Sequence, residues 1–159
     1  MNKILDTPLQ PAPEDKPANI WFRRIAIGIE ICLWIFTLMV AMLFKKESWE
    51  FSGELMILAF TSLAVFYLLF TFLVTGAKGR LQVWAAVGAG LAMSVKLAGS
   101  MFTIESWDGG HELLIAGYVA GLVSAIDMLF SQFKARRNGA STAFHWNVLA
   151  RLVFVMVIL

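Results

Sequence analysis

Five long runs of apolar residues, separated by short polar segments, dominate the chain. They occupy residues 21–44, 54–75, 81–102, 112–133 and 143–159. Each is close to the ~20 residues that a helix needs to cross the hydrocarbon core of a bilayer. None alternates between apolar and polar residues as a barrel strand would, and a helix satisfies its own backbone amides in lipid. The pattern predicts an all-α, polytopic transmembrane bundle of five helices.

Two of the polar segments are related in sequence. Residues 44–57 and 102–115 align at an offset of 58 (102 minus 44), and seven of the fourteen positions are identical. The matched residues that form the predicted repeat turn are Glu47 and Glu105, Trp49 and Trp107, and Glu54 and Glu112. We interpret the match as a tandem duplication of a helix–loop–helix unit. Because each unit crosses the membrane twice, both copies have the same orientation, unlike the inverted repeats of many transporters.

The duplication divides the chain into four segments. Residues 1–20 contain all four prolines and are predicted to form a flexible cytoplasmic tail, or alternatively a tail that orders against a partner. Residues 21–78 form the first two-helix repeat and residues 79–137 the second. Residues 138–159 form a C-terminal transmembrane helix without a counterpart in the duplication.

Composition and charge support a membrane protein and predict its orientation. Hydrophobic residues make up 59% of the chain and charged residues only 15%. Basic residues gather near positions 16–24, 78–80 and 134–137, whereas both repeat turns are rich in acids. Because short basic loops stay in the cytoplasm, the N-terminus should be cytoplasmic, and both turns and the C-terminus periplasmic. Indoles fit both interfaces, with Trp49 and Trp107 outside and Trp21, Trp84 and Trp146 inside.

Small residues predict which helices pack most closely. The third run is rich in Gly, Ala and Ser, and the fourth contains Gly117 and Gly121 four residues apart. Small side chains let helix backbones approach, which is a main source of attraction between helices in lipid. We therefore expect the third and fourth helices at the centre of the bundle. The second helix, with Phe60 and Phe66, is expected to face lipid or a partner.

Four ionisable residues are predicted to lie inside the membrane: Glu30, Lys96, Asp127 and Arg151. At 1.5 Å per residue, Glu30 lies ~9 Å, Asp127 ~10 Å and Arg151 ~12 Å from the inner boundary. Arg151 could therefore pair with Asp127 or with Glu30. Lys96 lies in the outer half of the membrane, where we expect it to pair with Glu112 or Glu54.

These charges allow two interpretations. They form an ion or proton path, or they neutralise one another and extend to the headgroups. The duplication favours the second interpretation, because Glu30 corresponds to Gly88 and Asp127 to Leu69. No buried charge is therefore common to both copies.

Nothing in the sequence indicates catalysis. No catalytic triad, phosphate loop, cysteine pair or dinucleotide fingerprint is present. Glu105, Asp108, His111 and Glu112 could in principle bind a divalent cation, but the first copy has glycine in place of His111 and the ligand spacing is not closed. His145 is interpreted as an interfacial residue. We expect no catalytic residue, no metal, no cofactor and no nucleic-acid partner.

The repeat turn resembles a pattern in small inner-membrane proteins of the Bacteroidetes, among them the two-helix portion of the gliding-motility and type IX secretion motor subunit. That pattern runs Phe-Lys-Ile-x-His-Trp-Pro-Gly, followed by a helix that begins Leu-Leu-Ile-x-Gly. The second copy matches it at Phe102, Ile104, Trp107, Gly109, Leu113, Leu114, Ile115 and Gly117, and the first copy at Phe44, Lys45, Trp49, Leu55 and Ile57. Serine replaces the histidine and an acid replaces the proline in both copies.

The resemblance implies a bacterial inner membrane and membership of a multi-subunit assembly. It does not imply motor function, because the buried glutamate of the motor subunit's second helix has no match in this chain. We therefore expect a non-enzymatic accessory or structural subunit that contacts lipids and either other membrane subunits or further copies of itself. The alternative is a small ion- or proton-coupled transporter that uses Glu30, Lys96 and Asp127.

Overall fold

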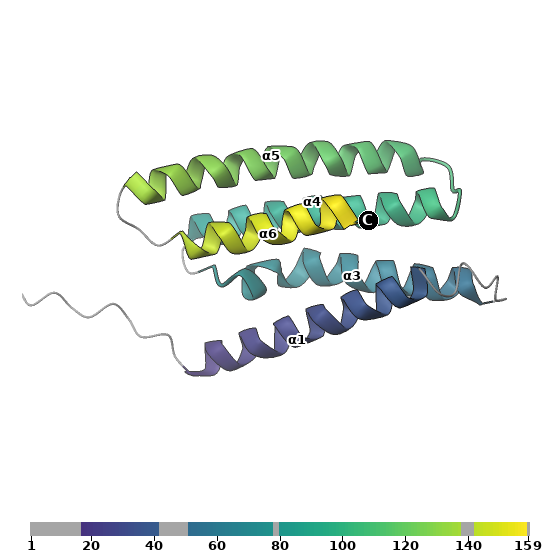
Figure 1. Cartoon of the computed structure of the whole chain (residues 1–159), viewed down its shortest axis with the longest axis horizontal. Helices are drawn as coiled ribbons and strands as arrows, with labels where there is room; N and C mark the ends of the chain where they lie inside the picture. The colour runs from purple at the N-terminus through teal and green to yellow at the C-terminus, as the bar shows by residue number, and fades with distance from the viewer. Residues whose placement is uncertain (1–16, 42–50, 78–79, 138–141, 159) are drawn as a thin grey trace, which may run out of the picture.

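The structure, a computed structural model, describes residues 17–41, 51–77, 80–137 and 142–158. Within these ranges the chain folds into five helices and no strands, which confirms the predicted all-α bundle (Figure 1). The helices are α1 (Pro17–Met39), α3 (Ser52–Thr75), α4 (Arg80–Ile104), α5 (Gly110–Arg137) and α6 (Ala143–Ile158). The predicted turn residues Glu47 and Trp49, and most of the predicted N-terminal tail, lie outside the described residues.

Three of these helices are long and apolar enough to cross a membrane, as expected of a membrane protein. The spans are Gly53–Thr75, Arg80–Ile104 and Gly110–Arg137. Helix α6 is apolar but shorter. Helix α1 is 23 residues long and carries Arg23, Arg24 and Glu30 among its apolar residues.

The helices follow one another across the bundle in the order α1, α3, α4, α5, and α6 lies against α4 and α5 (Figure 1). Consecutive helices run in opposite directions (Figure 1). Helix α4 contacts α3, α5 and α6 and is the central element. One apolar cluster lies among α1, α3 and α4, and a second lies among α4, α5 and α6.

The prediction that the third and fourth helices occupy the centre is right for α4 and wrong for α5. Helix α5 lies at the edge, and its buried residues are Gly110, Gly117, Gly121 and Met128. Helix α3 is the second interior helix, with Phe60 fully buried and Phe66 only 5% exposed. A bulky helix can be central because its neighbour α4 supplies the small residues that receive it.

Close backbone contacts account for the packing of α4 on both neighbours. A Cβ atom at Gly90 would lie 2.5 Å from the carbonyl oxygen of Tyr67 in α3. A Cβ atom at Gly99 would lie 2.5 Å from the backbone nitrogen of Leu114 in α5. Ser94 also donates a hydrogen bond of 2.6 Å to the carbonyl oxygen of Ala64. Glycine at these positions therefore sets the distance between helices, as in other bundles held together in lipid.

The turn between α4 and α5 is compact and has defined hydrogen bonds. Ser106 and Gly109 both have positive φ values, of 58° and 82°. At position 109 the glycine adopts this conformation without a steric penalty. The Trp107 backbone N–H donates to the Phe102 carbonyl at 2.8 Å, and the two rings meet edge to face at 4.9 Å. A Cβ atom at Gly53 would lie 3.5 Å from Glu105 Oε2. The start of α3 and the α4–α5 turn therefore lie at the same end of the bundle.

The opposite end is basic and has a well-formed helix terminus. Helix α3 ends at Gly76, which has φ 72°, and the Gly76 and Ala77 N–H groups donate to the Leu73 and Phe72 carbonyls. This is the left-handed C-terminal cap common in helices. Arg23 donates from Nε to the Val74 carbonyl at 3.3 Å and so satisfies another carbonyl of the last turn.

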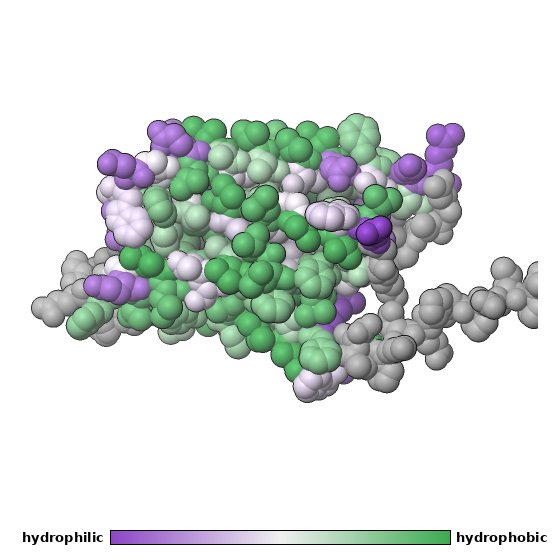
Figure 2. Space-filling model, turned by 180° about the vertical axis from the view of Figure 1, so that it is seen from behind, coloured by the Kyte–Doolittle hydropathy of each residue, from purple (hydrophilic) through white to green (hydrophobic). Residues whose placement is uncertain are grey.

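On the face shown in Figure 2, apolar side chains cover the middle of the molecule and hydrophilic ones gather toward its two ends. A water-soluble protein of this size rarely exposes so continuous an apolar surface. The exposed apolar residues include large side chains on every helix. This distribution matches a bundle surrounded by lipid between two polar boundaries.

Candidate functional site

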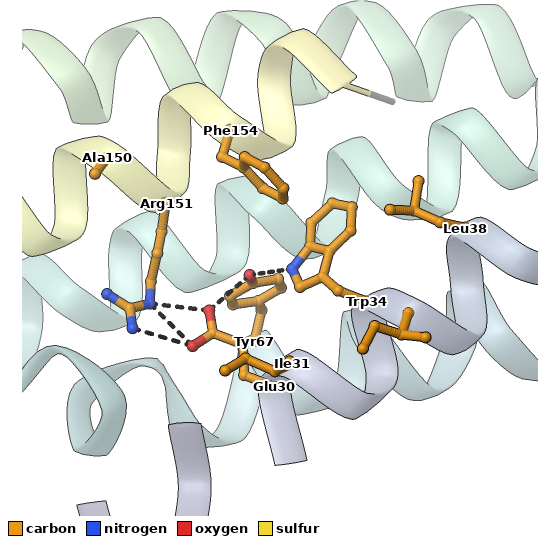
Figure 3. Close-up of a pocket in the computed structure, with 9 residues that line it drawn as sticks. Glu30, Ile31, Trp34, Leu38, Tyr67, Ala150, Arg151 and Phe154 are labelled. Carbon is orange, nitrogen blue, oxygen red and sulfur yellow. Dashed lines mark hydrogen bonds and ion pairs between the residues drawn. The ribbon is translucent and has the colours of Figure 1, made fainter. Parts of the chain in front are cut away.

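The structure brings Glu30 of α1 and Arg151 of α6 together across 121 positions of sequence. Arg151 Nε lies 2.9 Å from Glu30 Oε1 and 3.1 Å from Oε2, and Arg151 Nη2 lies 3.1 Å from Oε2 (Figure 3). Glu30 is only 6% exposed. Of the two partners that the sequence suggested for Arg151, the one it contacts is Glu30.

Two aromatic side chains extend this ion pair into the bundle. Tyr67 of α3 donates its hydroxyl proton to Glu30 Oε1 at 2.9 Å, and Trp34 of α1 donates its indole N–H to the Tyr67 hydroxyl at 2.8 Å. Both aromatic residues are buried, with Tyr67 1% and Trp34 7% exposed. The chain of hydrogen bonds runs Trp34 to Tyr67 to Glu30, so each buried polar group has a partner (Figure 3).

Arg151 is also held from its own helix. Its Nη1 donates to Asn147 Oδ1 at 2.7 Å and to the Asn147 carbonyl at 3.3 Å, one turn earlier in α6. Moving two charges out of water costs several kcal/mol per ion, and a buried pair offsets that cost only when further hydrogen bonds complete its geometry. The Glu30–Arg151 pair meets this condition, so it is a neutral, satisfied unit that connects α1 to α6.

A cavity of about 430 Å³ lies beside this network, between α1 and α6 and against α3 (Figure 3). Apart from the Glu30–Arg151 pair and the Tyr67 hydroxyl, its lining is apolar or aromatic. The lining residues are Glu30, Ile31, Trp34, Ile35, Leu38, Tyr67, Ala150, Arg151 and Phe154. The Trp34 and Phe154 rings meet edge to face, with centroids 4.7 Å apart.

Lys96 lies elsewhere, in the contact between α4 and α5. It is fully buried, donates from Nζ to Ser100 Oγ at 2.9 Å, and places Nζ 4.6 Å from the centre of the Tyr118 ring. The expected ion pair with Glu112 or Glu54 is not formed among the described residues. The reason is that Glu54 and Glu112 are exposed near the N-termini of their helices. The Lys96 side chain instead runs along α4 and reaches Ser100, one turn further on.

Asp127 and His145 occupy a third location, toward the basic end. Asp127 is exposed on α5 and does not pair with Arg151. His145, which the sequence predicts to lie at the level of the membrane interface, is buried against the α4–α5–α6 cluster at 7% exposure. Its Nδ1 has no hydrogen-bond partner within the described part of the chain.

The structure therefore separates the residues that an ion path would have to connect. Glu30 borders the cavity, but neither Lys96 nor Asp127 does. Across the described ranges, no group of three or more His, Cys, Asp or Glu side chains is placed to hold a metal ion. What the arrangement offers is a fixed, neutral ion pair at the polar end of an apolar cavity.

No protein-family model, curated protein or solved structure matches this chain.

Sequence reasoning identified Glu30 and Arg151 but missed Trp34 and Tyr67. Both aromatic residues lie inside long apolar runs, away from the ends where an indole or phenol normally meets the interface. A buried tyrosine or tryptophan usually finds a hydrogen-bond partner for its polar atom. Their position within the runs was therefore an available signal that a polar group lay nearby.

Proposed function

We propose that this protein is a non-enzymatic, multi-pass protein of the bacterial inner membrane, and that it serves as an accessory or structural subunit of a larger membrane complex. The observation that carries the proposal is the Glu30–Arg151–Tyr67–Trp34 network, in which the charges satisfy one another. Such a network fixes helices in place and leaves no charge free to carry an ion.

The distribution of charge supports a cytoplasmic position for one end of the bundle. Arg23, Arg24, Arg80 and the run of basic residues at 134–137 lie at the end where α1, α4 and α6 begin (Figure 1). Glu54, Glu105, Asp108 and Glu112 lie at the other end. By the preference of basic segments for the cytoplasm, the first end is inside and the turn containing Trp107 is outside. In this placement all five helices cross the bilayer.

The outer face of α5 supports the proposal that the chain binds another subunit. This helix packs on α4 through glycine and leaves a broad apolar face uncovered. The exposed large side chains on this face are Ile115, Tyr118, Val119, Leu122, Val123, Ile126, Leu129, Phe130 and Phe133. Asp127 is exposed beside this face and lies close enough to His145 of α6 to interact with it electrostatically, but it forms no ion pair among the described residues. A carboxylate on an apolar helix surface inside a membrane is costly unless it is compensated, and a basic or hydrogen-bonding side chain of a neighbouring subunit would add to the contribution of His145.

The alternative, an ion- or proton-coupled transporter, requires Glu30, Lys96 and Asp127 to share one polar path. They occupy three separate places: beside the cavity, within the α4–α5 contact, and on the exposed side of α5. This separation favours the subunit over the transporter.

Native purification tests the subunit proposal. Tagged protein is extracted in mild detergent, and co-eluting proteins are identified and quantified by mass spectrometry. We expect a partner protein to co-elute in a fixed ratio to the tagged chain. We expect Val123→Trp on the α5 face to reduce the amount of that partner. Leu91→Trp is the matched control, because Leu91 is comparably exposed at 53% on a different helix, α4.

Two results would contradict the proposal. The first is elution of the chain without a partner in a fixed ratio. The second is ion or proton flux in liposomes that contain the purified chain alone and that stops with Lys96→Leu while the fold is retained. The second result would support transport instead.

A further inference from the structure

The cavity between α1 and α6 has the properties of a binding site for a molecule dissolved in the membrane. Its volume, about 430 Å³, falls within the ~300–1,000 Å³ range of small-molecule pockets. Ile31 and Ile35 line it and are each 54% exposed, and Phe154 lines it and is 42% exposed. The cavity therefore opens on the side of the bundle, between α1 and α6, and in the proposed placement that side faces hydrocarbon.

The polar end of the cavity retains one unused hydrogen-bond donor. A guanidinium has five N–H groups. Those of Arg151 donate from Nε and Nη2 to Glu30 and from Nη1 to both oxygens of Asn147. One of the two Nη2 N–H groups is left without an acceptor among the described residues. The Arg151 side chain lines the cavity and is 17% exposed, so this N–H is open to an oxygen atom of a ligand.

The charge of the site determines the kind of oxygen. Glu30 already neutralises Arg151 at 2.9 Å, so an anionic headgroup would meet a carboxylate beside the guanidinium and gain no net attraction. An uncharged acceptor, such as a carbonyl, avoids that repulsion. The ligand is thus neutral, with an apolar body and at least one carbonyl oxygen.

The depth of the site in the membrane and the shape of the cavity narrow the class of ligand further. Arg151 lies ~12 Å and Glu30 ~9 Å inside the inner boundary at the helical rise, below the level of phospholipid headgroups. The edge-to-face Trp34 and Phe154 rings form an aromatic wall to the cavity. Aromatic walls of this kind favour a flat ring in an offset or edge-to-face arrangement. An isoprenoid quinone combines a flat ring, neutral carbonyl oxygens, an apolar tail and a location inside the hydrocarbon layer.

We propose that the cavity between α1 and α6 binds a membrane quinone, with a ring carbonyl accepting the free Nη2 hydrogen of Arg151 and the ring against Trp34 and Phe154. The proposal rests on the proposed membrane placement of α1 and α6 and is independent of the subunit role. It concerns binding alone and assigns no redox step to the protein.

The test measures thermal unfolding of the purified chain in phosphatidylcholine nanodiscs. Decylubiquinone is the probe, and decylbenzene, which has the same tail and a ring but no carbonyl, is the control. We expect a saturable rise in Tm with decylubiquinone and none with decylbenzene. An equal response to both compounds would overturn the proposal, because it would show apolar partitioning only.

Two matched variants locate the site. Ile35→Trp fills the cavity without touching the ion pair, and Phe36→Trp places the same side chain on the next residue, which does not line the cavity. We expect the decylubiquinone midpoint to be at least about tenfold weaker in the first variant and unchanged in the second. Leu38→Trp, also a lining residue, replaces Ile35→Trp if that variant does not fold. A midpoint unchanged by the cavity-filling variant would place the quinone elsewhere and overturn the assignment.

Discussion

Gly117 of α5 lies directly against the backbone of Lys96 in α4. A Cβ atom at position 117 would stand 2.5 Å from Lys96 Cα and 2.7 Å from its nitrogen. The two helices can approach this closely only because position 117 has no side chain. The contact also encloses the Lys96 side chain, which runs to Ser100 and the Tyr118 ring. The close backbone approach at this point and the burial of the Lys96 side chain therefore both depend on the glycine at position 117.

Gly117→Ala is expected to destabilise the protein by about 1–3 kcal/mol, the usual cost of overpacking a close contact. The clash is with backbone atoms, which cannot move aside as a flexible side chain would. The free energy of unfolding in a denaturing-detergent titration checks the prediction.

Gly88→Ala is the matched control for this substitution. Gly88 also lies in a helix long and apolar enough to cross a membrane, and nothing lies within 4 Å of a Cβ atom placed there. Alanine has the better helix propensity, so Gly88→Ala should be neutral or slightly stabilising. Equal destabilisation by both variants would show that the α4–α5 distance is not set at Gly117.

The Glu30–Arg151 pair should behave as a unit. Arg151→Met leaves a buried carboxylate unpaired, and the expected loss is about 3–5 kcal/mol in the free energy of unfolding. Glu30→Met leaves the guanidinium unpaired and should be similarly costly. The double variant removes both charges and should be more stable than either single variant, because replacing a whole buried pair by apolar residues is often neutral.

A double-mutant cycle over these three variants gives the coupling energy directly. Additive losses, with the double variant weaker than both singles, would mean that the two side chains do not depend on each other for charge compensation.

How much of this arrangement follows from sequence depends on the scale of the question. The five helices were predictable because lipid requires continuous apolar segments of a defined length, and the observed helices match the predicted runs closely. The Glu30–Arg151 contact was predictable as one of two options, since both residues lie at similar depth. The depth of a residue in the membrane could not exclude Asp127 as the partner of Arg151, because it does not show which helices are neighbours in the bundle.

Other features depend on three-dimensional neighbours and were not predictable in this way. The partner of Lys96 was expected to be a carboxylate, but rotation of α4 directs the side chain to Ser100 and Tyr118. The central position of α3 was missed because a bulky helix was expected to face lipid. Its Tyr67 side chain instead reaches Glu30 and Trp34, and the Tyr67 backbone carbonyl lies against Gly90. Whether a helix face meets lipid or another helix cannot be read from one helix alone.

Tyr67→Phe isolates the link between the ion pair and Trp34. It removes a hydroxyl that donates to Glu30 and accepts from Trp34, so it loses two hydrogen bonds and leaves the indole N–H without its acceptor. We expect a loss of about 1–2 kcal/mol in the free energy of unfolding. Tyr118→Phe serves as the control, because it keeps the ring that faces Lys96 and should have little effect. A Tyr67→Phe variant as stable as Tyr118→Phe would contradict the network.

Lys96→Met tests whether the buried cation contributes to stability. The Lys96 ammonium has one hydrogen bond and a ring contact in place of a carboxylate, so its desolvation is poorly compensated. Methionine keeps the length and flexibility of the side chain without the charge. We expect the variant to be at least as stable as the native chain when unfolding is followed by circular dichroism. A loss of more than about 2 kcal/mol would contradict the prediction, because it would mean that the Lys96 charge contributes to stability through its contacts within the chain.

The orientation of the bundle is tested by single cysteines at its two ends. In a Cys32→Ser background, Asp108→Cys places a thiol in the α4–α5 turn and Arg136→Cys places one at the far end of α5; both positions are exposed. Because the basic end should remain in the cytoplasm, a membrane-impermeant maleimide added to cells with a permeable outer membrane should label position 108 and not 136. After lysis both should react, which confirms that each thiol is accessible. Labelling of 136 alone in intact cells would invert the orientation. Labelling of both would mean that α5 does not cross the membrane, and the proposed placement of the whole bundle would fail with it.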